Sequence, residues 1–152
     1  ITLKVANRFA LNFNVQRPAR DFYASVKVSA PACQFRDRYG LLFRLRDDLN
    51  YYQFDVDCDG RYRLSKVENG TLTALEDWTA NAAIRAGSGA VNELSARAAG
   101  PSIEIFANGQ SLLNVSDNTF TDGGFGLIAG SGPGSPTYTA EFDDLSVWET
   151  AQ

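Results

Sequence analysis

The sequence predicts an all-β domain, a β-sandwich of roughly ten short strands, from two observations. Apolar and polar residues alternate in short runs, and turn residues separate these runs at spacings of about 8–12 residues. No run keeps the apolar period of a helix. The 152 residues are enough for one domain with a two-layer core, so we expect residues 1–152 to form a single β-sandwich.

The central run, residues 38–72, is expected to form three consecutive strands and the start of a fourth. If residues 47–50 make a four-residue turn, one sheet face becomes continuously apolar. The register predicted for this first hairpin pairs Leu45 with Tyr52, Phe43 with Phe54 and Leu41 with Val56.

The second hairpin is expected to turn through a three-residue loop at residues 58–60, with Gly60 in the left-handed conformation. This loop pairs Phe54 with Leu64 and Val56 with Tyr62, which continues the apolar face. A two-residue loop would instead bury the charges of Arg61 and Arg63, so the sequence favours the longer loop.

The other elements follow in chain order, each bounded by turn residues. Residues 22–30 alternate most clearly, with an apolar face from Phe22 to Ala30 and a polar face between. The remaining strands are expected at 1–5, 9–15, 71–75, 92–97, 102–106, 110–115, 124–129 and 138–148, with a break at 17–20, hairpin turns at 69–70 and 108–109, and loops at 80–89 and 130–136.

Composition excludes two classes of partner. Lys and Arg total 14 against 18 Asp and Glu, a net charge of −4, and no basic block is present, so the footprint of a nucleic-acid-binding protein is missing. No apolar run approaches the roughly 20 residues of a membrane span, so we expect no membrane insertion. The chain opens in mid-strand at Ile1 and contains no Met, which is typical of a processed or excised piece of a larger protein.

Cys33 and Cys58 are the two cysteines, and both fall at expected loop positions. A disulfide is the favoured interpretation, and two unrelated thiols are the alternative. A bridge that closes this loop would contribute about 3 kcal/mol in the chain-entropy model and would indicate an oxidising, extracytoplasmic setting. With no His in the chain, two cysteines cannot complete a zinc shell.

Short motifs recur in a characteristic order along the chain, at residues 39–44, 50–54, 59–62, 69–70, 78, 92–94, 106–110, 124–127 and 142–145. With these residues the chain resembles the concanavalin A-like lectin/glucanase superfamily, in particular bacterial extracellular laminin-G-like modules related to keto-disaccharide hydrolase and family 16 glycoside hydrolase domains. The resemblance spans nearly the whole chain and implies a jelly roll of two curved antiparallel sheets, which meets glycans or proteins on its concave sheet or at its loop rims. Residues 1–152 do not include the N-terminal segment that usually precedes these strands in that family.

Catalysis is not expected. The glucanase relatives carry paired carboxylates on one strand, and the nearest match here, at residues 141–146, lacks the second Glu. Without His, triads of the Ser-His-Asp type are excluded as well. A glycoside hydrolase-related enzyme is therefore the least favoured alternative.

The polar face of the central strands is the predicted ligand site, because planar hydrogen-bonding side chains beside an aromatic ring suit sugar hydroxyls and the apolar sugar face. The competing interpretation is a solvated sheet face whose charge pairs fix the register. Trp78 is interpreted as a core side chain, with a stacking platform as the alternative. The predicted ligand-binding residues are Arg44, Tyr51, Gln53, Asp55 and Arg63.

No cofactor is expected to be required, and a structural calcium ion is predicted at Asp143 or Asp144. The spacing of apolar residues there indicates a bulge that turns an Asp outward, and jelly-roll carbohydrate-binding modules, which the chain resembles, often hold calcium with such an Asp. Residues 55–60 match half of an EF-hand loop, but Lys66 stands where the loop needs Glu, so a hairpin is favoured.

Together these inferences predict a non-catalytic, extracellular or cell-surface module that binds an oligosaccharide or polysaccharide. The alternative class is a structural or adhesive module of a surface protein or filament, in which a sheet face packs on another surface protein. Glycan-array or calorimetric screening of the isolated domain, set against light scattering for self-association, would separate the two classes.

Overall fold

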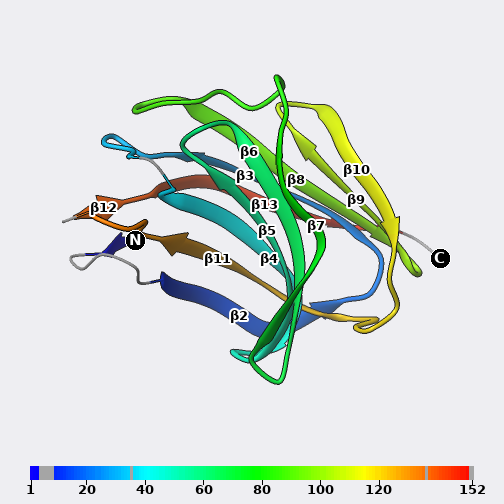
Figure 1. The fold of residues 1–152 in the computed structure, drawn as a ribbon. Coiled ribbons are helices and arrows are strands. Elements are labelled where there is room, and N and C mark those ends of the chain that lie inside the picture. Colours follow the sequence, from blue (N-terminus) through cyan, green and yellow to red (C-terminus); the bar gives the residue numbers. More distant parts are fainter. Residues whose placement is uncertain (4–8, 35, 136, 151–152) are drawn as a thin grey trace.

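A computed structural model describes residues 1–3, 9–34, 36–135 and 137–150. Two antiparallel sheets pack face to face, and the described ranges contain strands and turns but no helix (Figure 1). The strands are β1 (Thr2–Leu3), β2 (Phe9–Ala19), β3 (Phe22–Ser29), β4 (Arg38–Asp47), β5 (Asn50–Asp57), β6 (Arg61–Glu68), β7 (Thr71–Ala80), β8 (Val91–Ala99), β9 (Ser102–Ala107), β10 (Gln110–Ser116), β11 (Gly123–Gly130), β12 (Tyr138–Thr139) and β13 (Glu141–Glu149).

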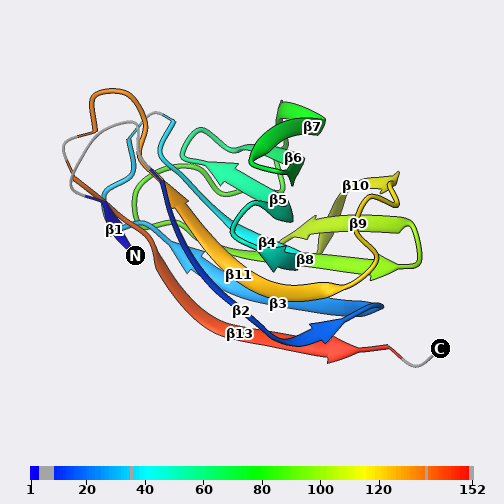
Figure 2. The ribbon, with the colours of Figure 1, turned by 90° about the horizontal axis from the view of Figure 1, so that it is seen from below.

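The sheets have six and five strands, in the orders β2-β11-β4-β5-β6-β7 and β10-β9-β8-β3-β13. A short antiparallel pair, β1 and β12, forms a separate two-stranded sheet beside the N-terminus (Figure 1). Figure 2 shows the two layers from below, curving alongside each other. The predicted all-β sandwich of two curved antiparallel sheets is therefore confirmed.

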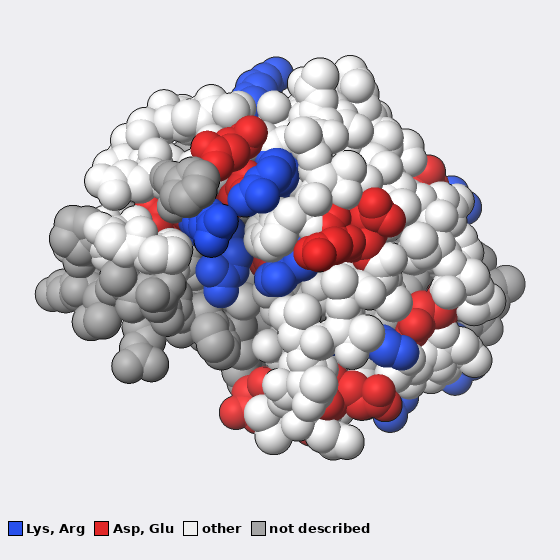
Figure 3. All heavy atoms as spheres, viewed as in Figure 1, with Lys and Arg blue, Asp and Glu red and all other residues white. Residues whose placement is uncertain are grey.

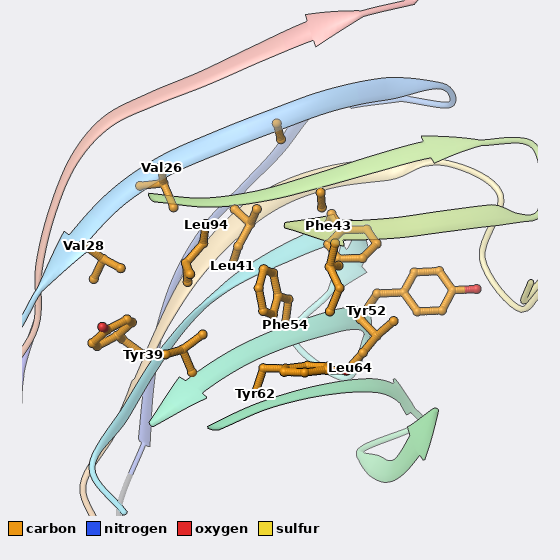
Figure 4. Packing of buried hydrophobic residues seen from close by; sticks show 14 of the residues in the cluster. Val26, Val28, Tyr39, Leu41, Phe43, Tyr52, Phe54, Tyr62, Leu64 and Leu94 are labelled. Atoms are coloured by element: carbon orange, nitrogen blue, oxygen red, sulfur yellow. The ribbon is translucent and has the colours of Figure 1, made fainter. Parts of the chain in front are cut away.

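The core lies between the sheets and is built from alternate residues of each strand (Figure 4). Phe22, Ala24, Val26 and Val28 of β3 are all buried, and Ala30 continues the row, as their alternation predicts. The facing sheet contributes a matching row of core residues. Between the two sheets, the rings of Phe22 and Phe43 meet edge-on, with 5.9 Å between their centroids. The main-core residues of β4, β5 and β6 are Tyr39, Leu41, Phe43, Tyr52, Phe54, Val56, Tyr62 and Leu64.

The second hairpin has the predicted register. Phe54 pairs with Leu64 and Val56 pairs with Tyr62. Gly60 has a φ of 83°, the left-handed conformation expected for the last residue of the three-residue loop. The half EF-hand pattern is accordingly a hairpin.

The register predicted for the first hairpin is wrong. Phe43 pairs with Tyr52 rather than Phe54, and Leu41 pairs with Phe54, because the turn has two residues and a bulge follows Phe43. The bulge is centred on Arg44, whose φ of 45° breaks the alternation of side chains. Leu45 consequently leaves the main core and joins a small apolar cluster on the opposite face of the sheet, with Leu42, Tyr51, Val67 and Ile128.

Two strand limits also differ from those expected. The predicted break at residues 17–20 falls at the end of β2, which continues through Pro18 to Ala19. Proline is tolerated there because β2 is the edge strand of its sheet. The strand expected at 71–75 extends to Ala80 as β7, which brings Trp78 into the sheet.

Cys33 and Cys58 form a disulfide, as predicted, with 5.7 Å between their Cα atoms. The bridge ties the segment after β3 to the turn between β5 and β6. It lies at the end of the sandwich where the chain also passes from β11 toward β12.

Candidate functional site

Two adjoining pockets open on the outer face of the six-stranded sheet. Their volumes are about 460 Å³ and 150 Å³, and Arg38 and Arg63 line both of them. The larger pocket is lined by Arg36, Arg38, Asp57, Arg61, Arg63, Trp78, Gly132 and Pro133. The smaller is lined by Arg38, Tyr51, Gln53, Arg63, Val67, Gly70, Leu72 and Ile128. In Figure 3, basic side chains gather beside acidic ones in a hollow of this molecular face.

Charge pairs across β5 and β6 organise the floor. Arg63 donates to Asp55 at 2.8 Å, and Arg61 contacts Asp57 at 2.6 Å between its terminal nitrogen and the carboxylate. The amide of Gln53 also donates to Asp55, at 2.6 Å. Both ion pairs lie in the hairpin whose register was predicted correctly, and each carboxylate is buried.

Two glycines make room for charged side chains on this face. A Cβ at Gly40 would lie 2.9 Å from Oδ1 of Asp55, and one at Gly130 would lie 2.5 Å from the guanidinium carbon of Arg38. Gly130 is the cross-strand partner of Arg38. The Arg38 guanidinium therefore lies directly over Gly130, and any side chain at that position would displace it.

Trp78 lies in the pocket and not in the core. Its ring is contacted by the guanidinium carbons of Arg61 and Arg63, at 5.4 and 4.7 Å from the ring centroid. Such cation–π contacts hold the two arginine side chains against β7. The interpretation of Trp78 as a core side chain is therefore wrong, and its place beside the charged residues is closer to the alternative.

Polar atoms without a hydrogen-bond partner concentrate on the same face. Across the described residues, six buried side-chain nitrogen or oxygen atoms have no partner, and four of them belong to side chains here. Native proteins satisfy nearly all buried polar groups, so such a group marks a place where a further molecule completes the bonding. The four atoms are Nε of Arg38, Oδ1 of Asp55, Nε of Arg63 and Oγ of Ser65.

The smaller pocket is more apolar. Tyr51, Val67, Leu72 and Ile128 supply most of its wall. Burial, reinforced by the nearby charge of Asp55, raises the pKa of Tyr51, so its hydroxyl stays protonated at neutral pH and keeps a donor. An aromatic and aliphatic wall next to guanidinium groups suits a ligand with one apolar and one polar face.

Asp37 holds the rim of the larger pocket. Its buried carboxylate accepts hydrogen bonds from the backbone of Gly132, at 2.7 Å, and from the hydroxyl of Ser135. Its backbone carbonyl accepts from the backbone nitrogen of Cys58 at 3.1 Å. Asp37 thus connects the 130–135 loop to the disulfide-bridged turn.

Four of the five predicted ligand residues lie together on this face: Tyr51, Gln53, Asp55 and Arg63. The fifth, Arg44, does not. Its side chain is fully buried at the opposite end of the sandwich, where it donates to backbone carbonyls of Arg20, Gly100 and Phe120 at 2.8 to 3.2 Å. The bulge turns it away from the open face, so the prediction that Arg44 points outward is wrong.

Arg38, Arg61 and Trp78 were not predicted as site residues. Arg38 lies across from Asp57, one step along the row that contains Asp55 and Gln53. The alternation of side chains within β4 was therefore the sequence signal that could have identified Arg38. The incorrect register predicted for the first hairpin concealed this signal. Trp78 can be recognised as a site residue only in the structure, where β7 continues past the strand end expected at residue 75.

The predicted calcium site keeps its bulge. The pairing of β13 with β3 shifts between Asp143 and Ser146, and Asp144 has a φ of 54°. The Asp144 carboxylate is exposed and lies 3.5 Å from the amine of Lys27. No group of three or more His, Cys, Asp or Glu suited to a metal ion occurs within the described ranges, and calcium at Asp143 or Asp144 stays a prediction.

No helix in the described part of the chain is long and apolar enough to cross a membrane. No protein-family model and no curated protein matches the chain. Solved structures do. Carbohydrate-binding module CBM66 from Bacillus subtilis superposes with a TM-score of 0.77 at 19% sequence identity, covering 96% of this chain and 84% of that one.

Two galectins are also similar in structure. Galectin-Ib from Xenopus laevis has a TM-score of 0.69 at 11% identity, covering 91% of this chain and 100% of its own. A toad ovary galectin in complex with thio-digalactose has a TM-score of 0.66 at 10% identity, covering 91% and 98%. At these identities the likeness shows the fold, a lectin-type β-sandwich.

Proposed function

We propose that the chain is a non-catalytic, lectin-like module of the concanavalin A-like superfamily, and that an oligosaccharide or polysaccharide binds in the paired pockets. One observation carries the proposal: four buried polar atoms without partners belong to a single hollowed sheet face. Sugar hydroxyls both donate and accept hydrogen bonds, so they complement guanidinium, carboxylate and hydroxyl groups together.

The dimensions and lining of the pockets support the same ligand class. Small-ligand sites have volumes of about 300–1,000 Å³, a range that includes the larger pocket. The smaller pocket adds an apolar wall around Tyr51 for the carbon face of a neighbouring sugar ring. Arg38 and Arg63 line both pockets. One oligosaccharide that spans the two pockets would therefore contact these two side chains from both pockets.

An extracellular, non-catalytic role accompanies this proposal. The disulfide favours an oxidising compartment. The acidic residues of the pockets, Asp55 and Asp57, are neutralised by Arg63 and Arg61, and a carboxylate held in an ion pair is poorly placed to act as a general acid. The solved carbohydrate-binding module and galectins named above add support by analogy of fold.

The two tryptophans of the chain provide a matched test. Trp78 lines the larger pocket, whereas Trp148 lies on β13 of the other sheet with 55% of its surface exposed. A glycan array with the wild-type protein would identify a binding sugar, and calorimetry with Trp78→Ala and Trp148→Ala would locate its site. We expect at least tenfold weaker binding for Trp78→Ala alone, from the typical loss of an interface aromatic. Equal affinity of both variants, or no glycan bound, contradicts the proposal.

A structural or adhesive role is the second candidate, and one observation favours it. β13 is the edge strand of the five-stranded sheet and carries three exposed apolar side chains, Leu145, Val147 and Trp148. Exposed apolar edges pair readily with another chain. Sedimentation of the wild type and of Val147→Lys would test this role, since self-association through β13 predicts dimers that the Lys variant loses.

A further inference from the structure

The larger pocket carries a local excess of positive charge in an acidic protein. Four arginines line it, whereas the chain as a whole has a net charge of −4. The acidic residues beside these arginines are Asp57 in the lining, Asp55 on the floor and Asp37 at the rim, so arginines still outnumber carboxylates around one hollow (Figure 3).

The carboxylates of Asp57 and Asp55 are already in ion pairs, although Oδ1 of Asp55 has no donor among the described residues. Asp57 accepts from Arg61 and from two backbone nitrogens of its own turn, and Oδ2 of Asp55 accepts from Arg63 and Gln53. Neither carboxylate lies within ion-pair distance of Arg38. Asp57 and Asp55 therefore neutralise Arg61 and Arg63, and Arg38 has no ion-pair partner among the residues that the structure describes.

Arg38 is the least satisfied charged side chain of the pocket. Its guanidinium makes no hydrogen bond or ion pair within residues 1–3, 9–34, 36–135 and 137–150, and its Nε is buried. The side chain as a whole is partly exposed, and an acceptor supplied by a ligand would satisfy its buried nitrogen. Arg63 faces the same two pockets and also has a buried Nε without an acceptor.

Guanidinium groups bind oxyanions strongly. The fork of an arginine matches the two oxygens of a carboxylate in a bidentate arrangement, and such charge-assisted bonds are stronger than neutral ones. A neutral sugar offers only hydroxyl acceptors to Arg38, whereas a sugar acid offers a carboxylate. The apolar wall of the smaller pocket lies directly beside Arg38 and accommodates the ring that bears this group.

We propose that the ligand is an acidic glycan, and that the carboxylate of a uronic acid unit binds to Arg38 and Arg63 where the two pockets meet. This inference rests on the proposed carbohydrate-binding function and narrows it to one ligand class. Gly130 positions the Arg38 guanidinium by leaving open the space above the strand. Trp78 positions Arg63 from the other side.

The test compares oligogalacturonates and alginate oligomers with the same oligomers after their carboxyl groups have been reduced to alcohols. Calorimetry is expected to give binding of at least one uronate, weakened about ten- to hundredfold by reduction, the range for loss of a charge-assisted hydrogen bond. If the reduced oligomer or another neutral glycan binds equally well, the acidic-ligand inference is overturned and the carbohydrate function stands. If no glycan of any kind binds, both fail.

Variants separate specific recognition from general attraction of polyanions. Arg38→Ala is expected to lose about ten- to hundredfold in uronate affinity without a change in melting temperature, because Arg38 has no hydrogen bond to lose among the described residues. Gly130→Ala retains the charge but displaces the guanidinium, so it should weaken binding as well. Arg97→Ala, on the other sheet and 57% exposed in its side chain, is the matched control. Equal losses for Arg38→Ala and Arg97→Ala, or equal binding of dextran sulfate, would overturn the inference.

Discussion

Replacement of Arg44 is expected to destabilise the fold more than replacement of any other arginine. The side chain is fully buried, and its three nitrogens donate four hydrogen bonds to three backbone carbonyls, those of Arg20, Gly100 and Phe120. These carbonyls come from three different connections of the two sheets. Asp21 lies 3.7 Å away and balances the charge. Arg44 therefore ties both sheets together at one end of the sandwich.

The magnitude follows from the contacts. In Arg44→Ala the carbonyls lose their donors, and each hydrogen bond to a charged group contributes about 1.5–3 kcal/mol. Because neighbouring losses are not additive, we expect about 3–5 kcal/mol, the range for breaking a buried charged group away from its partners. This is a large fraction of the total stability of roughly 5–15 kcal/mol for a domain.

Urea denaturation followed by tryptophan fluorescence measures this loss. Arg44→Lys is expected to recover only part of it, since an ammonium group cannot reach three carbonyls in a fixed fork. Arg46→Ala is the matched control, because Arg46 is half exposed, forms an ion pair with Asp122 at 3.2 Å and lies 5.8 Å from the Phe120 ring centroid. It should change the free energy of unfolding by less than about 1 kcal/mol. If Arg44→Ala costs no more than Arg46→Ala, the structural role assigned to Arg44 is refuted.

Three further predictions concern covalent, acid–base and metal chemistry. Intact mass after alkylation without reduction should show no modified thiol, and reduction of the Cys33–Cys58 bridge should cost about 3 kcal/mol; two alkylated thiols at the outset would contradict the disulfide. Burial raises the pKa of Tyr52 to about 12, so a difference absorbance titration of the folded protein should show that this tyrosine ionises late. Because the unfolded chain ionises first, the free energy of unfolding should fall as the pH rises from about 10 to about 12. Ionisation of every tyrosine near pH 10 in the folded protein would contradict this prediction. If calcium binds at Asp143 or Asp144, calcium should raise the melting temperature by a few degrees and Asp144→Ala should abolish the shift, whereas a shift that survives Asp144→Ala places the ion elsewhere.

Where the sequence carries strict alternation, it predicts the structure residue by residue. β3 is such a case, since every second residue from Phe22 to Val28 is apolar and buried. The second hairpin is another, because burial of Arg61 and Arg63 would have been too costly in any other register. In both places one physical constraint, the separation of charge from the core, is enough to choose between alternatives.

The first hairpin fails for a reason that is not local. A charged residue in mid-strand predicts an outward side chain, and Arg44 is instead drawn inward by carbonyls 24 to 76 residues away in the sequence. A bulge adds one residue to the strand and reverses the faces beyond it, so Leu45 moves outward. No pattern within β4 encodes those distant acceptors.

The register error in the first hairpin also explains why the candidate site was predicted only in part. Gln53, Asp55 and Arg63 belong to the hairpin whose register was derived correctly. Arg38 belongs to the strand whose register was not, and the space it occupies is created by Gly130 on β11, a strand that sequence alone does not place beside β4.

Stability and ligand binding are assigned to different charged residues in this fold. Arg44 at one end and Asp37 at the other are both buried, and both use their charges to bind backbone groups of connecting loops. Arg38 is bound by neither loop nor strand in the described ranges, although its neighbours on the same face are paired. A partly exposed charged group that the fold does not use, placed over a glycine between two pockets, adds little to the stability of the free protein and is available to a ligand. Its loss should therefore reduce affinity while leaving the unfolding transition where it is.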